Sequence, residues 1–143
     1  MSRYLIVTHQ TALSPDLQRT VRALVAEDPA AEFAVLVPEA PGLSFTWEGE
    51  TVDVARHRAE AAKTLLEETA RARVFRTAVG VPEPLQAITD ELLMHPGYDA
   101  LVICTLPPGI SRWLKLDLVH RAERKFGLRV IHVLAATPAP ARP

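Results

Sequence analysis

Short, uninterrupted apolar runs alternate with segments of helical periodicity along most of this chain, and this alternation restricts the fold more than any other feature. The runs Tyr4–Thr8, Phe33–Val37 and Ala100–Cys104 show no polar alternation, which is typical of strands covered on both faces. Leu128–Leu134 is also expected to form a strand, although it contains Arg129 and His132. Arg73–Thr77 is more polar and is expected near a sheet edge. Strands that alternate with helices require right-handed crossovers, so we expect an α/β fold: a parallel sheet with helices on both faces.

The helices between these strands begin and end at recognisable residues. Ser14 and Pro15 supply an N-cap and a first-turn proline for the first helix, and Asp28-Pro29 ends it. Further helices are expected over Val52–Ala70 and Ser111–Phe126, and a third is expected to open at Pro82 and Pro84 and to run to about Met94. A loop is expected over Glu39–Thr51. We therefore interpret residues 1–134 as one α/β domain and residues 135–143, which are rich in Ala and Pro, as a flexible tail.

Composition excludes several functional classes. The chain has 143 residues and a net charge of −1 without blocks of one sign, so there is no electrostatic case for nucleic-acid binding. No apolar run approaches the roughly 20 residues that a membrane-spanning helix needs. The chain enters its first strand directly, unlike a signal peptide, and its single cysteine cannot form an internal disulfide. We expect a cytoplasmic protein.

Candidate ligand contacts follow from the expected sheet. Open parallel sheets bind ligands beside the carboxyl ends of their strands, where the strand order reverses. Thr8 ends the first strand and His9 follows it, Val37 ends the second, and Cys104 and Thr105 lie at the end of the fourth. His9 could contact a ligand, act as a general base or only shape a turn. Cys104 could be a reactive thiol or an inert core residue.

The loop after the fourth strand leads straight into a helix. Backbone N–H groups at such a junction favour anions, although Pro107-Pro108 makes this loop poor in glycine. Thr105, the Gly109 backbone, Ser111 and Arg112 could together hold a small oxyanion. The alternative is that Ser111 only caps its helix and Arg112 only faces solvent.

The whole chain to about Leu134 resembles the universal stress protein family, and its last segment, Tyr98–Leu134, is one ground for this resemblance. Tyr98–Ile103 is similar to its Asp-Leu-Ile-Val-Met strand, Gly109–Leu114 to its Gly-Leu-Ser-Arg-Leu-Leu segment and Val130–Val133 to its closing Pro-Val-Leu-Val-Val strand. The order of elements and the long loop after the second strand agree as well. The resemblance implies a flavodoxin-like (Rossmann-like), doubly wound five-stranded sheet with strand order 3-2-1-4-5. It also implies a homodimer through Val130–Leu134, an apolar strand without lysine or proline that is suited to edge pairing.

Four positions that contact the nucleotide in ATP-binding members of that family differ here. Cys104 replaces the first motif glycine, Pro107 lies near the second, Leu116-Asp117 replaces the Gly-Ser pair that holds the β- and γ-phosphates, and Thr8-His9-Gln10 lacks the aspartate that contacts the nucleoside. Losing glycine removes room for a phosphate, proline has no N–H to donate, and an inward-facing Asp117 would repel an anion. ATP binding in the family's usual manner is therefore disfavoured.

Three functions remain open. The first is a non-catalytic stress-protein-like homodimer that acts through a small ligand or protein partners and needs no cofactor. The second is a nucleotide-binding member (ATP or AMP) with an altered phosphate loop. The third is an enzyme that uses His9 with Cys104 or Ser111. The histidines show no metal-ligand spacing, and no serine lies in a Gly-x-Ser-x-Gly motif. Trp113 could cover the crevice or continue the apolar stripe of its helix.

Overall fold

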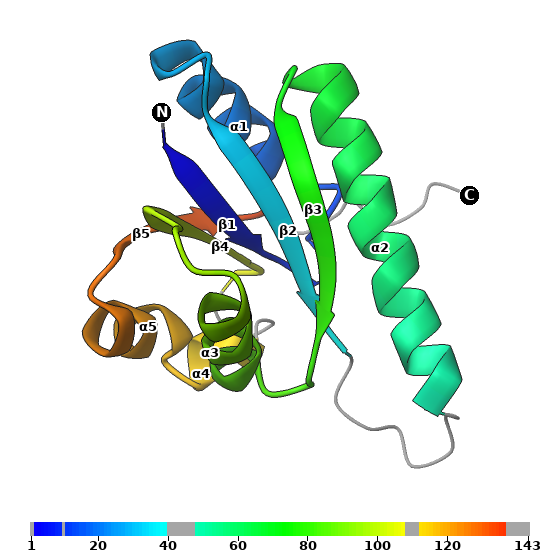
Figure 1. Cartoon of the computed structure of the whole chain (residues 1–143). Coiled ribbons are helices and arrows are strands. Elements are labelled where there is room, and N and C mark those ends of the chain that lie inside the picture. Colours follow the sequence, from blue (N-terminus) through cyan, green and yellow to red (C-terminus); the bar gives the residue numbers. More distant parts are fainter. Residues whose placement is uncertain (1, 10, 40–47, 108–111, 137–143) are drawn as a thin grey trace.

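Five parallel strands form one sheet in the order β3-β2-β1-β4-β5, which confirms the expected α/β class and strand order (Figure 1). The structure is a computed structural model that describes residues 2–9, 11–39, 48–107 and 112–136. In chain order its elements are β1 (Arg3–Val7), α1 (Pro15–Glu27), β2 (Glu32–Pro38), α2 (Glu48–Thr69), β3 (Arg73–Gly80), α3 (Pro84–Met94), β4 (Ala100–Thr105), α4 (Arg112–Lys115), α5 (Leu118–Phe126) and β5 (Arg129–Leu134).

The sheet separates two apolar cores (Figure 1). Helices α1 and α2 cover one face, where Leu17 and Leu66 pack against strand residues such as Ile6. Helices α3 and α5 cover the other, where Ile88 and Leu118 are fully buried. Burying each such side chain contributes about 1.5–3 kcal/mol, so the central strands, covered on both faces, form a rigid base for the residues at their carboxyl ends.

The expected helix over Ser111–Phe126 is wrong in one respect, because the structure contains two helices there. Helix α4 ends at Lys115, and the amides of Leu116 and Asp117 bond back to carbonyls only three residues earlier. Asp117 then adopts a left-handed conformation with φ of 53°, which breaks the helix before α5 begins. Aspartate tolerates this conformation better than most residues, a preference that helical periodicity does not reveal.

Other boundaries differ less. Strand β3 continues to Gly80, beyond the expected end at Thr77, and it is an edge strand as expected. Helix α2 already begins at Glu48, inside the segment expected to be a loop. No helix in the described ranges is long and apolar enough to cross a membrane.

The packed part of the chain extends past β5. The amide of Ala135 donates to the carbonyl of Thr105 at 2.8 Å, and the amide of Ala136 donates to Asp16 on α1 at 2.8 Å. These two residues of the predicted tail are therefore held against the domain, while residues 137–143 lie outside the described part of the chain.

A buried carboxylate stabilises the side of the sheet covered by α3. Glu91 on α3 is 5% exposed and receives two hydrogen bonds from the Arg76 guanidinium, at 2.8 and 3.1 Å. The Tyr98 hydroxyl donates a third at 3.0 Å, and burial together with the Glu91 charge raises the pKa of that phenol. Arg76 of β3 and Tyr98, which precedes β4, therefore supply the hydrogen bonds that this buried carboxylate needs. Through these bonds Glu91 connects α3 to both segments.

Candidate functional site

A buried hydroxyl network closes the space between the carboxyl ends of β1 and β4. The Thr8 and Thr11 hydroxyl oxygens lie 2.7 Å apart, and Thr11 donates to the Cys104 carbonyl at 3.2 Å. The Thr8 amide also donates to the Leu36 carbonyl at 3.1 Å, so the turn after β1 is tied to both neighbouring strands. Thr8, a predicted ligand contact, thus has internal partners. The sequence did not identify Thr11 as a site residue because Thr11 belongs to no motif.

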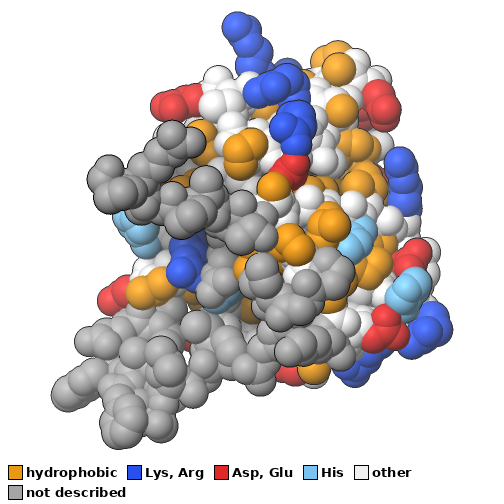
Figure 2. Space-filling model, turned by 180° about the vertical axis from the view of Figure 1, so that it is seen from behind, with side chains coloured by type: hydrophobic (Ala, Val, Ile, Leu, Met, Phe, Trp, Pro, Cys, Tyr) orange, Lys and Arg blue, Asp and Glu red, His pale blue; other side chains and the backbone are white. Residues whose placement is uncertain are grey.

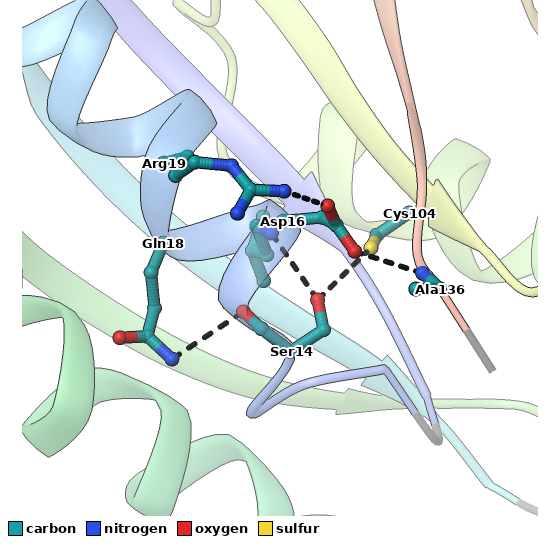
Figure 3. Close-up of polar contacts among 7 residues, drawn as sticks. Ser14, Asp16, Gln18, Arg19, Cys104 and Ala136 are labelled. Carbon is teal, nitrogen blue, oxygen red and sulfur yellow. Dashed lines mark hydrogen bonds and ion pairs between the residues drawn. The ribbon is translucent and has the colours of Figure 1, made fainter. Parts of the chain in front are cut away.

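Cys104 contacts the beginning of α1 rather than open solvent (Figure 3). Its Sγ lies 3.8 Å from Ser14 Oγ, and that oxygen also accepts from the Leu17 amide at 3.2 Å, which confirms Ser14 as the N-cap. Cys104 is 1% exposed. Burial raises the pKa of the thiol, only partly offset by hydrogen bonds to Thr11 and Ser14. The sulfur is therefore protonated at neutral pH, which favours the inert core residue over the reactive thiol.

The chain after β5 covers the same end of α1. Asp16 accepts from the Ala136 amide with one carboxylate oxygen and pairs with Arg19 through the other (Figure 3). The first turn of α1 is therefore occupied by groups of the chain itself, namely an N-cap serine and an acidic side chain. On this side the carboxyl edge is closed.

His9 lies on the part of the carboxyl edge where the Arg58 guanidinium faces it. NH1 of Arg58 on α2 lies 3.1 Å from His9 Nε2 and 3.5 Å from Nδ1. Burial, and secondly the Arg58 charge, lower the pKa of His9 to about 4, so the ring is neutral at physiological pH. The Trp113 ring of α4 lies 6.4 Å away, tilted by 50°. Within the described residues, no carboxylate pairs with Arg58.

Sequence reasoning missed Arg58. It lies on a helix without a motif, 49 positions from its partner His9 in the chain. The one available signal is its position on α2, whose inner stripe of Ala55, Ala59 and Ala62 is buried against the sheet. Such a small-residue stripe brings the helix close to the sheet, so that a long neighbouring side chain can reach the strand ends.

Thr105 is directed to β5. Its hydroxyl lies 2.6 Å from His132 Nε2, and the residue is buried. Partial burial, and secondly nearby His120, lower the pKa of His132. Thr105 is therefore engaged with the neighbouring strand, although it was predicted to help hold an oxyanion.

The predicted site residues thus divide into separate groups. Thr8 and Cys104 share the buried network, Thr105 joins β5, and His9 faces Arg58 and Trp113. Val37 is 0% exposed and its side chain packs in the core beneath α1 and α2. Gly109, Ser111 and the Arg112 side chain lie outside the described part of the structure, and Arg112 begins α4.

The enzyme hypothesis required His9 and Cys104 to face one shared pocket. They have different partners instead: the thiol contacts Ser14 and the imidazole contacts Arg58. Asp117 is exposed and its carboxylate lies 4.0 Å from Arg124, so its charge is directed toward α5. In the described ranges, no three His, Cys, Asp or Glu side chains converge in a way that could hold a metal ion.

Comparison with known proteins identifies a structural neighbour. No protein-family model matches the chain, and no curated protein matches its sequence. Among solved structures, it is similar to a universal stress protein in complex with cAMP, with a TM-score of 0.56 and 15% sequence identity. The match covers 92% of this chain and 96% of that one. This chain therefore has the fold of a universal stress protein, as its C-terminal segment predicted.

Proposed function

We propose that this chain is a divergent universal stress protein that acts in the cytoplasm as a non-catalytic module and binds a small anionic ligand at the carboxyl edge of its sheet. The observation that carries the proposal is Arg58, which faces a neutral imidazole and pairs with no carboxylate among the described residues. A guanidinium without a carboxylate partner among the described residues is a natural partner for phosphate or carboxylate.

The candidate catalytic groups argue for binding rather than chemistry. A general base works best when its pKa is near the operating pH, whereas the pKa of His9 is lowered to about 4. A thiol nucleophile needs a lowered pKa and access, whereas Cys104 is buried and its pKa is raised. Neither group is prepared for its catalytic role.

More specifically, we propose that this anionic ligand is a nucleotide with a single phosphate. The structural neighbour was solved with cAMP, a nucleotide without β- or γ-phosphates. The replacement of the family's Gly-Ser pair by Leu116-Asp117 affects contacts to exactly those absent groups. Trp113 beside His9 offers an aromatic surface for a base, and Arg58 offers a charge for the phosphate.

We also propose that two copies pair through β5. This strand is at the edge of the sheet, and its Leu134 side chain is 50% exposed. Figure 2 views the molecule from behind and shows hydrophobic side chains and a histidine gathered near the centre of that face. An apolar edge strand with unpaired backbone groups is a ready surface for a second copy.

Isothermal titration with ATP, ADP, AMP and cAMP in Mg²⁺ buffer tests the ligand. We expect AMP or cAMP to bind at least ten-fold more tightly than ATP, and Arg58→Gln to weaken that binding at least ten-fold. Arg56→Gln, at an exposed position of the same helix, is the matched control and should change affinity less than two-fold. Micromolar ATP binding, or equal losses in both variants, would contradict the proposal.

A further inference from the structure

A groove between α3 and α5 is lined largely by cations. It has a volume of about 380 Å³ and is bounded by Leu85 of α3 and by Arg121, Arg124 and Lys125 of α5. The three basic residues are spaced by three and four positions, which places them on one side of the helix. The groove lies on the sheet face opposite α1 and α2, where α3 and α5 pack as neighbours (Figure 1).

These cations have little compensation among the described residues. Arg124 lies 4.0 Å from the Asp117 carboxylate, and its side chain is 71% exposed. The Lys125 ammonium lies 5.8 Å from the ring of Phe126, and no described carboxylate pairs with Arg121. Exposed pairs at such distances contribute little, so the positive charge of the groove stays available.

The carboxylates of the two helices are engaged elsewhere. At the start of α3, Glu83 caps the amides of Leu85 and Gln86 at 3.3 and 2.6 Å. Asp90 accepts from the Gln86 side chain at 2.8 Å, and Glu91 is buried with its own arginine partner. On α5, Glu123 lies 3.5 Å from His120. The acidic side chains of α3 and α5 thus each have another described partner.

Helix stabilisation explains only part of this arrangement. Arg124 and Lys125 lie in the last turn of α5, where a positive charge offsets the negative end of the helix dipole. Arg121 lies in the first half of the helix, where a cation gains nothing from that dipole. Stabilisation of the helix dipole therefore does not explain why Arg121 lies beside Arg124 and Lys125 along the groove.

We propose that this groove binds a compact anion that carries several phosphate groups. Two guanidinium groups can each form paired hydrogen bonds to phosphate oxygens, and the lysine adds a point charge. The groove is open to solvent rather than enclosed, and Leu85 provides an apolar contact for an organic part of the ligand. The groove shares no residue with the carboxyl edge. A test of this proposal is therefore independent of a test of the function proposed above.

Titration with inorganic tripolyphosphate at 0.15 M salt tests this site, read by calorimetry and by amide shifts in NMR spectra. We compare the wild type with Arg121→Gln/Arg124→Gln and with a control of equal charge, Arg56→Gln/Arg73→Gln, whose side chains are exposed on α2 and β3. We expect shifts confined to α5 and the start of α3, and affinity at least ten-fold weaker in the groove variant but within two-fold in the control.

Two results would overturn the proposal. One is the absence of tripolyphosphate binding by the wild-type protein. The other is an equal loss of affinity in both double variants, which would show that only net charge matters. Because the mutated side chains are exposed and remain polar, both variants should fold, and their far-UV circular dichroism should match the wild type.

Discussion

Because His9 is neutral in the folded protein, we expect the free energy of unfolding to decrease as the pH is lowered. In the folded protein, burial and secondly the charge of Arg58 lower the pKa of His9 from 6.5 to about 4. The unfolded chain therefore takes up this proton near pH 6.5, and the folded chain does so only near pH 4. The stability contributed by neutral His9 is fully present above pH 6.5 and is lost as the pH falls through this window.

The size of this loss follows from the two pKa values. Each pH unit between the folded and unfolded pKa values corresponds to 1.36 kcal/mol, so without solvent screening the free energy of unfolding would fall by about 3 kcal/mol. Since His9 is only partly buried, solvent screening reduces the expected loss to about 1–2 kcal/mol. Urea unfolding between pH 4 and pH 7 measures it, and the variant His9→Gln, which cannot titrate, gives the background from all other groups.

The variant Arg58→Gln separates the two causes. It keeps hydrogen-bond donors near the imidazole and removes the charge, while burial, the larger cause, remains. At about 4 Å, a charge is worth about 1 kcal/mol in bulk water and about 4 kcal/mol near a protein surface. The pKa of His9 should therefore rise to about 5 or higher, but it should stay below 6.5 because burial remains. NMR titration of the His9 ring reads this value directly. A wild-type pKa near 6.5, or an unchanged pKa in Arg58→Gln, would refute the reasoning.

Three further variants test the fold and its assembly. Arg76→Ala leaves the Glu91 carboxylate buried with a single donor and should lower the free energy of unfolding by about 3 kcal/mol in urea titrations; a loss below 1 kcal/mol would mean that water replaces the arginine. Gly80→Ala should cost about 1–3 kcal/mol by the same assay, because an added Cβ would lie 2.5 Å from Ala87 Cβ, and an unchanged midpoint would show that α3 shifts freely. Leu134→Lys, at an exposed position of β5, should give a monomer in sedimentation experiments at a concentration where the wild type is a dimer, and an unchanged mass would place the interface elsewhere.

The strand framework was predictable because it depends on local pattern. A run such as Phe33–Val37 without polar alternation has to be covered on both faces, and Ser14 caps its helix through contacts within one turn. The break at Asp117 was not predictable, since aspartate only permits the left-handed conformation and does not require it.

The candidate site was harder to predict because it depends on side chains that are distant in sequence. The strand ends correctly indicated where Thr8, His9 and Cys104 lie. They did not indicate that Thr11 would bond to the Cys104 carbonyl across 93 positions, or that Arg58 would reach His9. Such contacts depend on the packing of turns and helices against the sheet, which neither periodicity nor motif spacing encodes.

Two groups of contacts lie at the carboxyl edge of the sheet. Between β1 and β4, the hydroxyls of Thr8 and Thr11 satisfy each other and the Cys104 carbonyl, and the chain at Ala136 covers the first turn of α1. The same turn after β1 begins with His9, whose ring meets Arg58 of α2. A ligand that approaches this edge would therefore encounter a cation in place of a glycine-rich loop. One guanidinium can neutralise one phosphate or carboxylate, whereas a triphosphate needs several donors, which is why we propose a ligand with a single anionic group.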